Sequence, residues 1–187
     1  ITIFMVVGVC NAFNMMDGMD GLVGFVLLVA WTCISIISLT KNGFGGLFIS
    51  SVILSCFLLF NLGLLGKRWK IFLGDSGAMW IGFITAWFLV VFTQQEDNLL
   101  FPPATALWII SLPLIDALST FLRRILKRKS IFLGDRTHIH HILLDSGLKK
   151  WKVLLIFLII SIISGGFAIY FALSDTEESL QFYGFLT

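Results

Sequence analysis

Charged side chains are scarce in this sequence of 187 residues. Asp, Glu, Lys and Arg make up only 13% of it, whereas 58% of the residues are hydrophobic and the mean hydropathy is +0.97. A soluble domain ordinarily carries about 25% charged residues, so the composition excludes an ordinary soluble protein. We expect an integral membrane protein, because a helix needs about 20 mostly apolar residues to cross a bilayer and the sequence holds several such runs.

Cysteines are also few. The three in the chain, Cys10, Cys33 and Cys56, fall within apolar runs and at spacings too wide for a metal-binding knuckle. We therefore expect buried small side chains, and no disulfide framework.

The expected fold class is all-α, a polytopic transmembrane helix bundle that forms a single membrane domain over residues 1–187. Hydropathy predicts five full spans, with partial spans at both ends of the chain. The expected spans cover residues 1–13 (partial), 22–40, 46–66, 77–93, 104–122 and 153–173. Because the chain opens at Ile1 within a hydrophobic run, we expect it to be the C-terminal part of a longer protein.

Basic residues are distributed unevenly between the expected loops. Of the 13 Lys and Arg residues, 12 lie in loops 67–76 and 123–152, whereas Lys41 lies on the other side with five acidic residues. Basic residues near span ends favour the cytoplasm, so we expect loops 14–21, 67–76 and 123–152 to be cytoplasmic. The span middles are almost free of charge, which favours a site at the membrane surface over a transport pathway.

Two carboxamides and two carboxylates recur every three residues near the start of the chain: Asn11, Asn14, Asp17 and Asp20. At 3.6 residues per turn, neighbours in this series can share a helix face but all four cannot. Gly18 and Gly21 weaken a regular helix, so we expect a helix end that opens into a polar loop. Paired carboxylates suit a divalent cation or a hydroxylated substrate, and helix capping at the membrane boundary is the alternative.

A second candidate is Asp75, in the segment Ile-Phe-Leu-Gly-Asp-Ser-Gly at 71–77. With Ser76 beside it, Asp75 could simply cap the next span. Its expected location on the same side as Asp17 and Asp20 favours a functional role.

Three histidines, His138, His140 and His141, follow the basic run of loop 123–152. On a helix, His138 and His141 would share a face that excludes His140, so convergence of all three requires a turn. Neutral imidazoles could bind zinc. They could equally contact phosphates together with Arg136, whose guanidinium suits bidentate phosphate binding in a loop that attracts anions.

In this order and on one expected side, the three motifs resemble those of the polyprenyl-phosphate N-acetylhexosamine-1-phosphate transferases, glycosyltransferase family 4. The motifs read Asn14-x-x-Asp17-Gly-x-Asp20-Gly-Leu, Phe-Leu-Gly-Asp75-x-Gly and Asp135-Arg136-x-His138-x-His140-His141. The His-Ile-His-His form, Asn-Ala-Phe-Asn at 11–14 and the stretch from Thr105 to Leu114 are similar to the bacterial WecA type, which uses UDP-N-acetylglucosamine.

The resemblance implies transfer of N-acetylglucosamine 1-phosphate from UDP-N-acetylglucosamine to undecaprenyl phosphate, with release of UMP. It places the enzyme in the bacterial inner membrane, with the active site facing the cytoplasm, at the first membrane step of a surface polysaccharide such as O-antigen. It implies Mg²⁺, or Mn²⁺ in its place, contacts with membrane lipids, and no nucleic acid. Other family donors, carrying N-acetylgalactosamine or phospho-muramoyl-pentapeptide, remain alternatives, as does a zinc-binding membrane scaffold or transporter of a different class.

The resemblance also implies residue roles. Asp17, Asp20 and Asp75 would be catalytic, with Asp75 as the metal ligand; Asn14, Asp17 and Asn61 would bind the nucleotide. The sugar diphosphate would be held by four residues: Arg136, His138, His140 and His141. The family also carries an adjacent Asp-Asp pair, which this sequence lacks. We expect that pair to precede Ile1, and residues 1–187 alone to be inactive.

Overall fold

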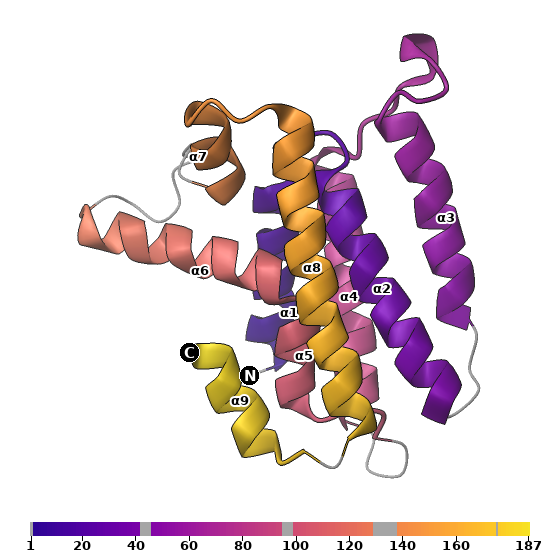
Figure 1. The fold of residues 1–187 in the computed structure, drawn as a ribbon, viewed down its shortest axis with the longest axis vertical. Coiled ribbons are helices and arrows are strands. Elements are labelled where there is room, and N and C mark those ends of the chain that lie inside the picture. The colour runs from indigo at the N-terminus through magenta and orange to yellow at the C-terminus, as the bar shows by residue number, and fades with distance from the viewer. Residues whose placement is uncertain (1, 42–45, 95–98, 129–137, 175) are drawn as a thin grey trace.

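The regular elements of the computed structural model are helices throughout residues 2–41, 46–94, 99–128, 138–174 and 176–187, the part of the chain that it describes. They are α1 (Thr2–Met16), α2 (Leu22–Lys41), α3 (Gly46–Asn61), the short 3₁₀ helix η1 (Lys67–Trp69), α4 (Gly74–Gln94), α5 (Pro103–Ile109), α6 (Ser111–Leu126), α7 (Ile139–Asp145), α8 (Lys150–Leu173) and α9 (Glu178–Leu186). The predicted all-α membrane bundle is confirmed (Figure 1).

Three helices of the described chain, α2, α4 and α8, are long and apolar enough to cross a bilayer by themselves. They run in roughly the same direction through the bundle, and the shorter apolar helices α1 and α3 accompany them (Figure 1). The longest, α8, has 24 residues and ends at Leu173. The chain is a multi-pass membrane protein.

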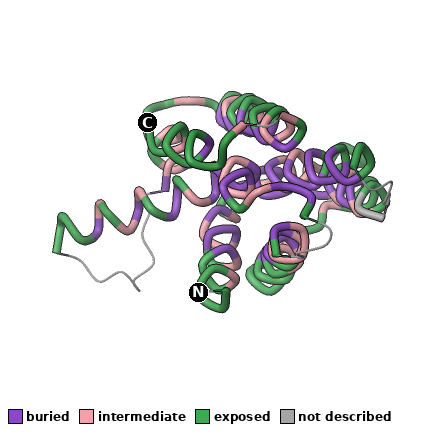
Figure 2. Tube along the Cα trace, turned by 90° about the horizontal axis from the view of Figure 1, so that it is seen from below, coloured by how far each residue is buried: buried purple, intermediate pink, exposed green. Residues whose placement is uncertain are grey.

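The expected span 104–122 is broken. It consists of α5 and α6, whose axes meet at 83°. Pro113 explains the break, because proline has no N–H to donate to the carbonyl four residues earlier, at Ile109, and its ring clashes with that carbonyl. Ile110 lies between the two helices with φ −107° and ψ 22°. As a result α6 leaves the bundle and runs across its axis (Figures 1 and 2).

The expected span 46–66 is also shorter than predicted, because α3 ends at Asn61. The chain then turns through Gly63 and Gly66, whose φ values of 70° and 107° lie in the left-handed region.

The cysteines follow the predicted burial only in part. Cys33 is buried and Cys10 is half-buried, but burial of Cys56 was wrong, because it is exposed on α3.

Small residues let the helices approach closely. A Cβ added to Gly82 would lie 3.0 Å from the Cα of Cys10, where α4 crosses α1. A Cβ on Gly165 would lie 2.5 Å from the Sγ of Cys33, where α8 meets α2. Close backbone approach of this kind is the usual basis of helix association in membranes.

One end of the bundle gathers the segments that carry the sequence motifs. The turn after α1, the connection between α3 and α4, the helix α7 and the start of α8 all lie at this end, whereas α9 lies toward the other (Figure 1). The break after α5 contributes to this arrangement, since α6 carries the chain sideways before it reaches α7.

Candidate active site

The first motif lies where α1 ends and α2 begins. Asp17 donates its N–H to the carbonyl of Asn14, at 3.2 Å, and the chain leaves the helix at Met16. Gly21 has φ +80°, a left-handed conformation that favours glycine. The predicted helix end that opens into a polar loop is therefore correct, and both Asp17 and Asp20 are in the turn.

Asn61 joins this turn to the connection that precedes α4. Its Oδ1 accepts a hydrogen bond from the backbone N–H of Gly21, at 2.6 Å, and its Nδ2 donates to the carbonyl of Ile71, at 2.9 Å. The side chain is 5% exposed. Asn61 thus holds two loops in register, and its predicted nucleotide contact stays a prediction.

Loss of this double contact is expected to destabilise the protein. Asn61→Leu keeps the approximate shape but leaves the N–H of Gly21 and the carbonyl of Ile71 without the partner they have now. We expect a loss of about 1–3 kcal/mol in the free energy of unfolding, measured by thermal unfolding in detergent. The matched control is Asn11→Leu, because Asn11 is exposed and donates only to Val7 of its own helix. Equal stability of the two variants would contradict the role of Asn61 in holding the two loops together.

A cavity of about 310 Å³ opens between these loops. The carboxylate-bearing residues Asp17, Asp20 and Asp75 all line it, as the sequence predicts. The remaining lining residues are Gly18, Met19, Asn61, Phe72, Leu73, Gly74 and Lys150. Four separate segments of the chain therefore build one site.

Asp75 lies in the first turn of α4, directly after Gly74, whose φ is +70°. The N-terminal end of a helix favours a carboxylate electrostatically. The side chain is exposed, and among the described residues it has no hydrogen-bond partner. Asp75 is therefore free to contact a ligand.

Two lysines that the sequence interpretation missed bring positive charge to the cavity. Lys70 donates to Asp20 Oδ2 at 2.7 Å, and its Nζ lies 5.0 Å from the centre of the Phe72 ring. Lys150, the first residue of α8, lines the cavity directly. Both belong to the basic loops that indicated the orientation, but nothing in the sequence distinguished them from the other basic residues there.

The predicted histidines form a stack around the start of α7. His138 immediately precedes the helix, and its ring lies 5.9 Å from that of His140, with 10° between the two planes. The ring of His141 lies 4.2 Å from that of His140. The turn that convergence required is thus present, whereas Arg136 and Asp135 lie outside the described residues.

His140 connects this stack to the first motif. Its side chain is fully buried, and a Cβ added to Gly18 would overlap its Nε2. The imidazole therefore packs against the backbone of the turn that lines the cavity. Among the described residues, neither of its ring nitrogens has a hydrogen-bond partner.

A sequence model of glycosyl transferase family 4 matches residues 1–93, which hold the first two motifs. The third motif lies in the part covered by individual relatives. The chain is 38% identical to the undecaprenyl-phosphate alpha-N-acetylglucosaminyl 1-phosphate transferase of Yersinia pestis over 151 residues, 79% of this chain and 41% of that protein. The chain belongs to glycosyl transferase family 4.

Other relatives bear the same name. The Salmonella typhi transferase is 37% identical over 170 residues, 88% of this chain and 46% of that protein. The Haemophilus influenzae transferase is 37% identical over 130 residues, 69% of this chain and 36% of that protein. The chain thus spans less than half the length of these curated relatives.

Asp17 shows the electrostatic character of the cavity. Its pKa is raised, first by burial and then by the nearby carboxylates of Asp75 and Asp20. Mutual repulsion between carboxylates is relieved when a divalent cation binds beside them, so the donor set suits a hard cation such as Mg²⁺.

The described residues do not offer a closed metal cage. No three of their His, Cys, Asp or Glu side chains converge closely enough to hold an ion by themselves. Mg²⁺ commonly uses one or two carboxylates and takes its other ligands from water and phosphates, which fits this cavity. Zinc usually takes three or four protein ligands, and the described residues offer no such set.

His140 makes the stability of the protein depend on pH. Burial, followed by the neighbouring His141, lowers its pKa from 6.5 to about 4. The unfolded chain therefore binds a proton between these values that the folded protein does not bind. We expect the contribution of neutral, buried His140 to the free energy of unfolding to be complete above pH 6.5. This contribution should be lost as the pH falls toward 4. Thermal unfolding of wild type and His140→Gln from pH 7.5 to 4.5 tests this, and parallel curves would contradict it.

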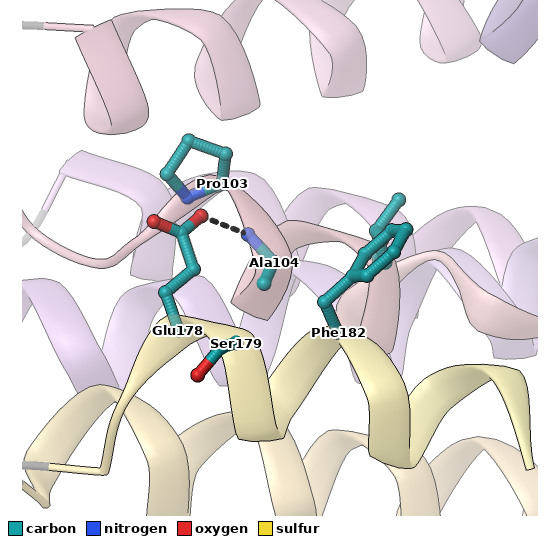
Figure 3. A pocket seen from close by; sticks show the side chains of 6 residues that line it. Pro103, Ala104, Glu178, Ser179 and Phe182 are labelled. Carbon is teal, nitrogen blue, oxygen red and sulfur yellow. Dashed lines mark hydrogen bonds between the residues drawn. The ribbon is translucent and has the colours of Figure 1, made fainter.

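A second cavity, of about 390 Å³, lies between α5 and α9 at the opposite end of the bundle. Figure 3 shows Glu178 reaching from α9 to the start of α5, where its Oε1 accepts the N–H of Ala104 at 3.0 Å. Glu178 is the one ionisable residue among the described residues that line this cavity. Because it is used to cap α5, we assign this cavity a structural role.

Proposed function

We propose that the protein transfers N-acetylglucosamine 1-phosphate from UDP-N-acetylglucosamine to undecaprenyl phosphate and releases UMP. The observation that carries the proposal is the cavity itself, in which Asp17, Asp20 and Asp75 are grouped with Lys150. The names of the relatives support N-acetylglucosamine 1-phosphate as the transferred group and undecaprenyl phosphate as the acceptor. The reaction would take place at the cytoplasmic face of the bacterial inner membrane, as the first membrane step of a surface polysaccharide such as O-antigen.

The chemistry joins two phosphorylated substrates. An oxygen of the acceptor phosphate attacks the β-phosphorus of the donor, and the bond from that phosphorus to the oxygen of the α-phosphate breaks. The sugar phosphate becomes linked to the lipid, and UMP leaves with the electron pair. Such transfers depend on positioning and on neutralisation of charge more than on covalent chemistry by the protein.

The residues of the cavity suit these requirements. Asp75, with Asp17 nearby, would hold Mg²⁺, which neutralises diphosphate charge when it is bound. Lys150 would attract the diphosphate. Lys70 now contacts Asp20 and would be able to bind a phosphate oxygen in its place. The exposed ring of Phe72 offers a flat surface for the nucleotide base.

The arrangement also fits a lipid acceptor. The cavity lies where α2, α4 and α8, the membrane-crossing helices, begin at one end of the bundle. A lipid phosphate at the membrane surface and a soluble nucleotide sugar can both reach this level. A site buried at the bilayer midplane would exclude the soluble donor.

The proposal is tested with the intact protein in detergent, undecaprenyl phosphate and Mg²⁺. UDP-N-acetylglucosamine is compared with UDP-N-acetylgalactosamine and with UDP-muramoyl-pentapeptide as donors in competition. We expect lipid-linked N-acetylglucosamine, little competition from the other donors, and loss of product when EDTA is added. Preferential use of another donor would reject the sugar assignment, and absence of any lipid-linked product would reject the transferase.

A further inference from the structure

Asp116 on α6 is a buried carboxylate whose two oxygens both bind the segment at the start of α7. Its Oδ2 lies 2.9 Å from Nδ1 of His138, and its Oδ1 accepts the backbone N–H of Ile139 at 2.7 Å. The Asp116 side chain is 1% exposed. A residue that only capped its own helix would not place both oxygens on a segment more than 20 positions away.

We propose that Asp116 is a positioning residue for the transfer reaction: it fixes α7 against α6 and holds the His138 imidazole with its proton on Nδ1. The proposal rests on the function proposed above and adds a residue that the three motifs do not contain. Asp116 does not line the cavity, so it would act through His138 and α7.

The assignment of the proton follows from the chemistry of the carboxylate. An ionised carboxylate only accepts hydrogen bonds, so the nitrogen that faces Asp116 must donate. A neutral imidazole carries one N–H, and with that proton on Nδ1 the other ring nitrogen, Nε2, is left to contact a ligand. Thr120 also lies near Nδ1, with its Oγ1 at 3.3 Å, but a hydroxyl can donate or accept and does not select a tautomer.

Asp116 is also linked indirectly, through α7, to the turn that carries Asp17. The N–H that it binds belongs to Ile139, the first residue of α7, and His140 follows directly. The buried ring of His140 packs on Gly18, which adjoins Asp17. A shift of α7 away from α6 would therefore move the group that supports the Asp17 turn.

The variant Asp116→Asn separates the two contacts with little change in shape. An asparagine offers one acceptor oxygen, whereas Asp116 now accepts from two N–H groups. If the oxygen stays on the Ile139 N–H, the amide NH₂ faces Nδ1 of His138 and can bind it only when that nitrogen has no proton. The tautomer then changes to Nε2–H.

Nitrogen NMR of ¹⁵N-histidine-labelled intact protein measures this directly. The His138 signals are assigned by their loss in His138→Gln. We expect a protonated Nδ1 in wild type and an unprotonated Nδ1 in Asp116→Asn. Thr120→Val, which leaves both bonds of Asp116 intact, should keep the wild-type signal. An unprotonated Nδ1 in wild type overturns the proposal, even if the Asp116 variant does not fold.

Activity supplies the second measurement. We expect Asp116→Asn to lower kcat for sugar-phosphate transfer by about 10- to 100-fold, the range known for partners that orient metal-binding histidines, with KM for undecaprenyl phosphate unchanged. The matched control is Asp145→Asn, because Asp145 is an exposed acid at the other end of α7, and it should retain wild-type rates. Wild-type kcat in Asp116→Asn overturns the proposal.

The two measurements also separate this proposal from the function on which it rests. If wild type transfers no sugar phosphate, the proposed function fails. A tautomer change in Asp116→Asn would in that case still support the contact between Asp116 and His138.

Discussion

Asp75→Asn is expected to abolish sugar-phosphate transfer, with a loss of at least about 1,000-fold in kcat. The substitution keeps the size of the side chain and removes the negative charge from the cavity. Interactions that neutralise charge in the transition state commonly contribute about 100- to 1,000-fold each, and a cation held by Asp75 would be lost as well. The measurement is the initial rate of lipid-linked product formation by the intact protein with saturating substrates.

Two observations show whether the loss is chemical. Thermal unfolding should change little, because the electrostatic contribution of an exposed carboxylate in the first turn of a helix is only about 0.3–1 kcal/mol. Asp145→Asn provides the matched control and should keep full activity. Turnover like that of wild type in Asp75→Asn would remove Asp75 from the catalytic group.

The same variant should change the titration of Asp17. Repulsion from Asp75 is the second cause of the raised pKa of Asp17, after burial. Removal of that charge should lower the pKa of Asp17, so that its carboxylate stays ionised to lower pH. Carboxyl ¹³C NMR of labelled protein would detect the change without any substrate.

Gly18→Ala is expected to have the second-largest effect, about 100-fold on kcat. The added Cβ would overlap Nε2 of His140, whose ring is fully buried and has no exposed direction in which to move. Either the turn or α7 must shift, and a displacement of about 1 Å in a catalytic site can cost about 100-fold in rate. Gly18 does not have a left-handed φ, so alanine itself is compatible with the backbone there.

Gly8→Ala is the matched control, because a Cβ at Gly8 meets nothing within 4 Å. A double variant, Gly18→Ala with His140→Ala, removes the overlapping ring and should recover the thermal stability lost in the single variant. Overpacking of this kind typically costs about 1–3 kcal/mol. If Gly18→Ala is as active and as stable as Gly8→Ala, the contact between the turn and α7 is not needed.

The sequence predicted the helical class and the grouping of the motifs because both depend on simple patterns. Apolar runs near bilayer length identify helices, and the bias of basic residues assigns loops to sides. With the loops assigned, Asp17, Asp20 and Asp75 had to lie at one end, and the structure places all three around one cavity. The end of the first helix was predictable because Gly18 and Gly21 weaken a regular helix where two carboxylates occur.

The features that were missed depend on tertiary contacts. Asp116 belongs to none of the three sequence motifs, and only the bend after α5 brings it to His138. Pro113 was visible, but prolines also occur in continuous membrane helices, so it did not predict a break of 83°. Asn61 and Lys150 lie at helix ends 89 residues apart, and no local pattern shows that both border the same cavity.

The central claim is that the cavity transfers a sugar together with its phosphate. The most direct measurement follows the β-phosphate of UDP-N-acetylglucosamine labelled there with ³²P, incubated with intact protein, undecaprenyl phosphate and Mg²⁺. We predict that the label appears in the lipid product and that the released nucleotide is unlabelled UMP. Release of labelled UDP, with unlabelled sugar on the lipid, would show transfer of the sugar alone and would contradict the account.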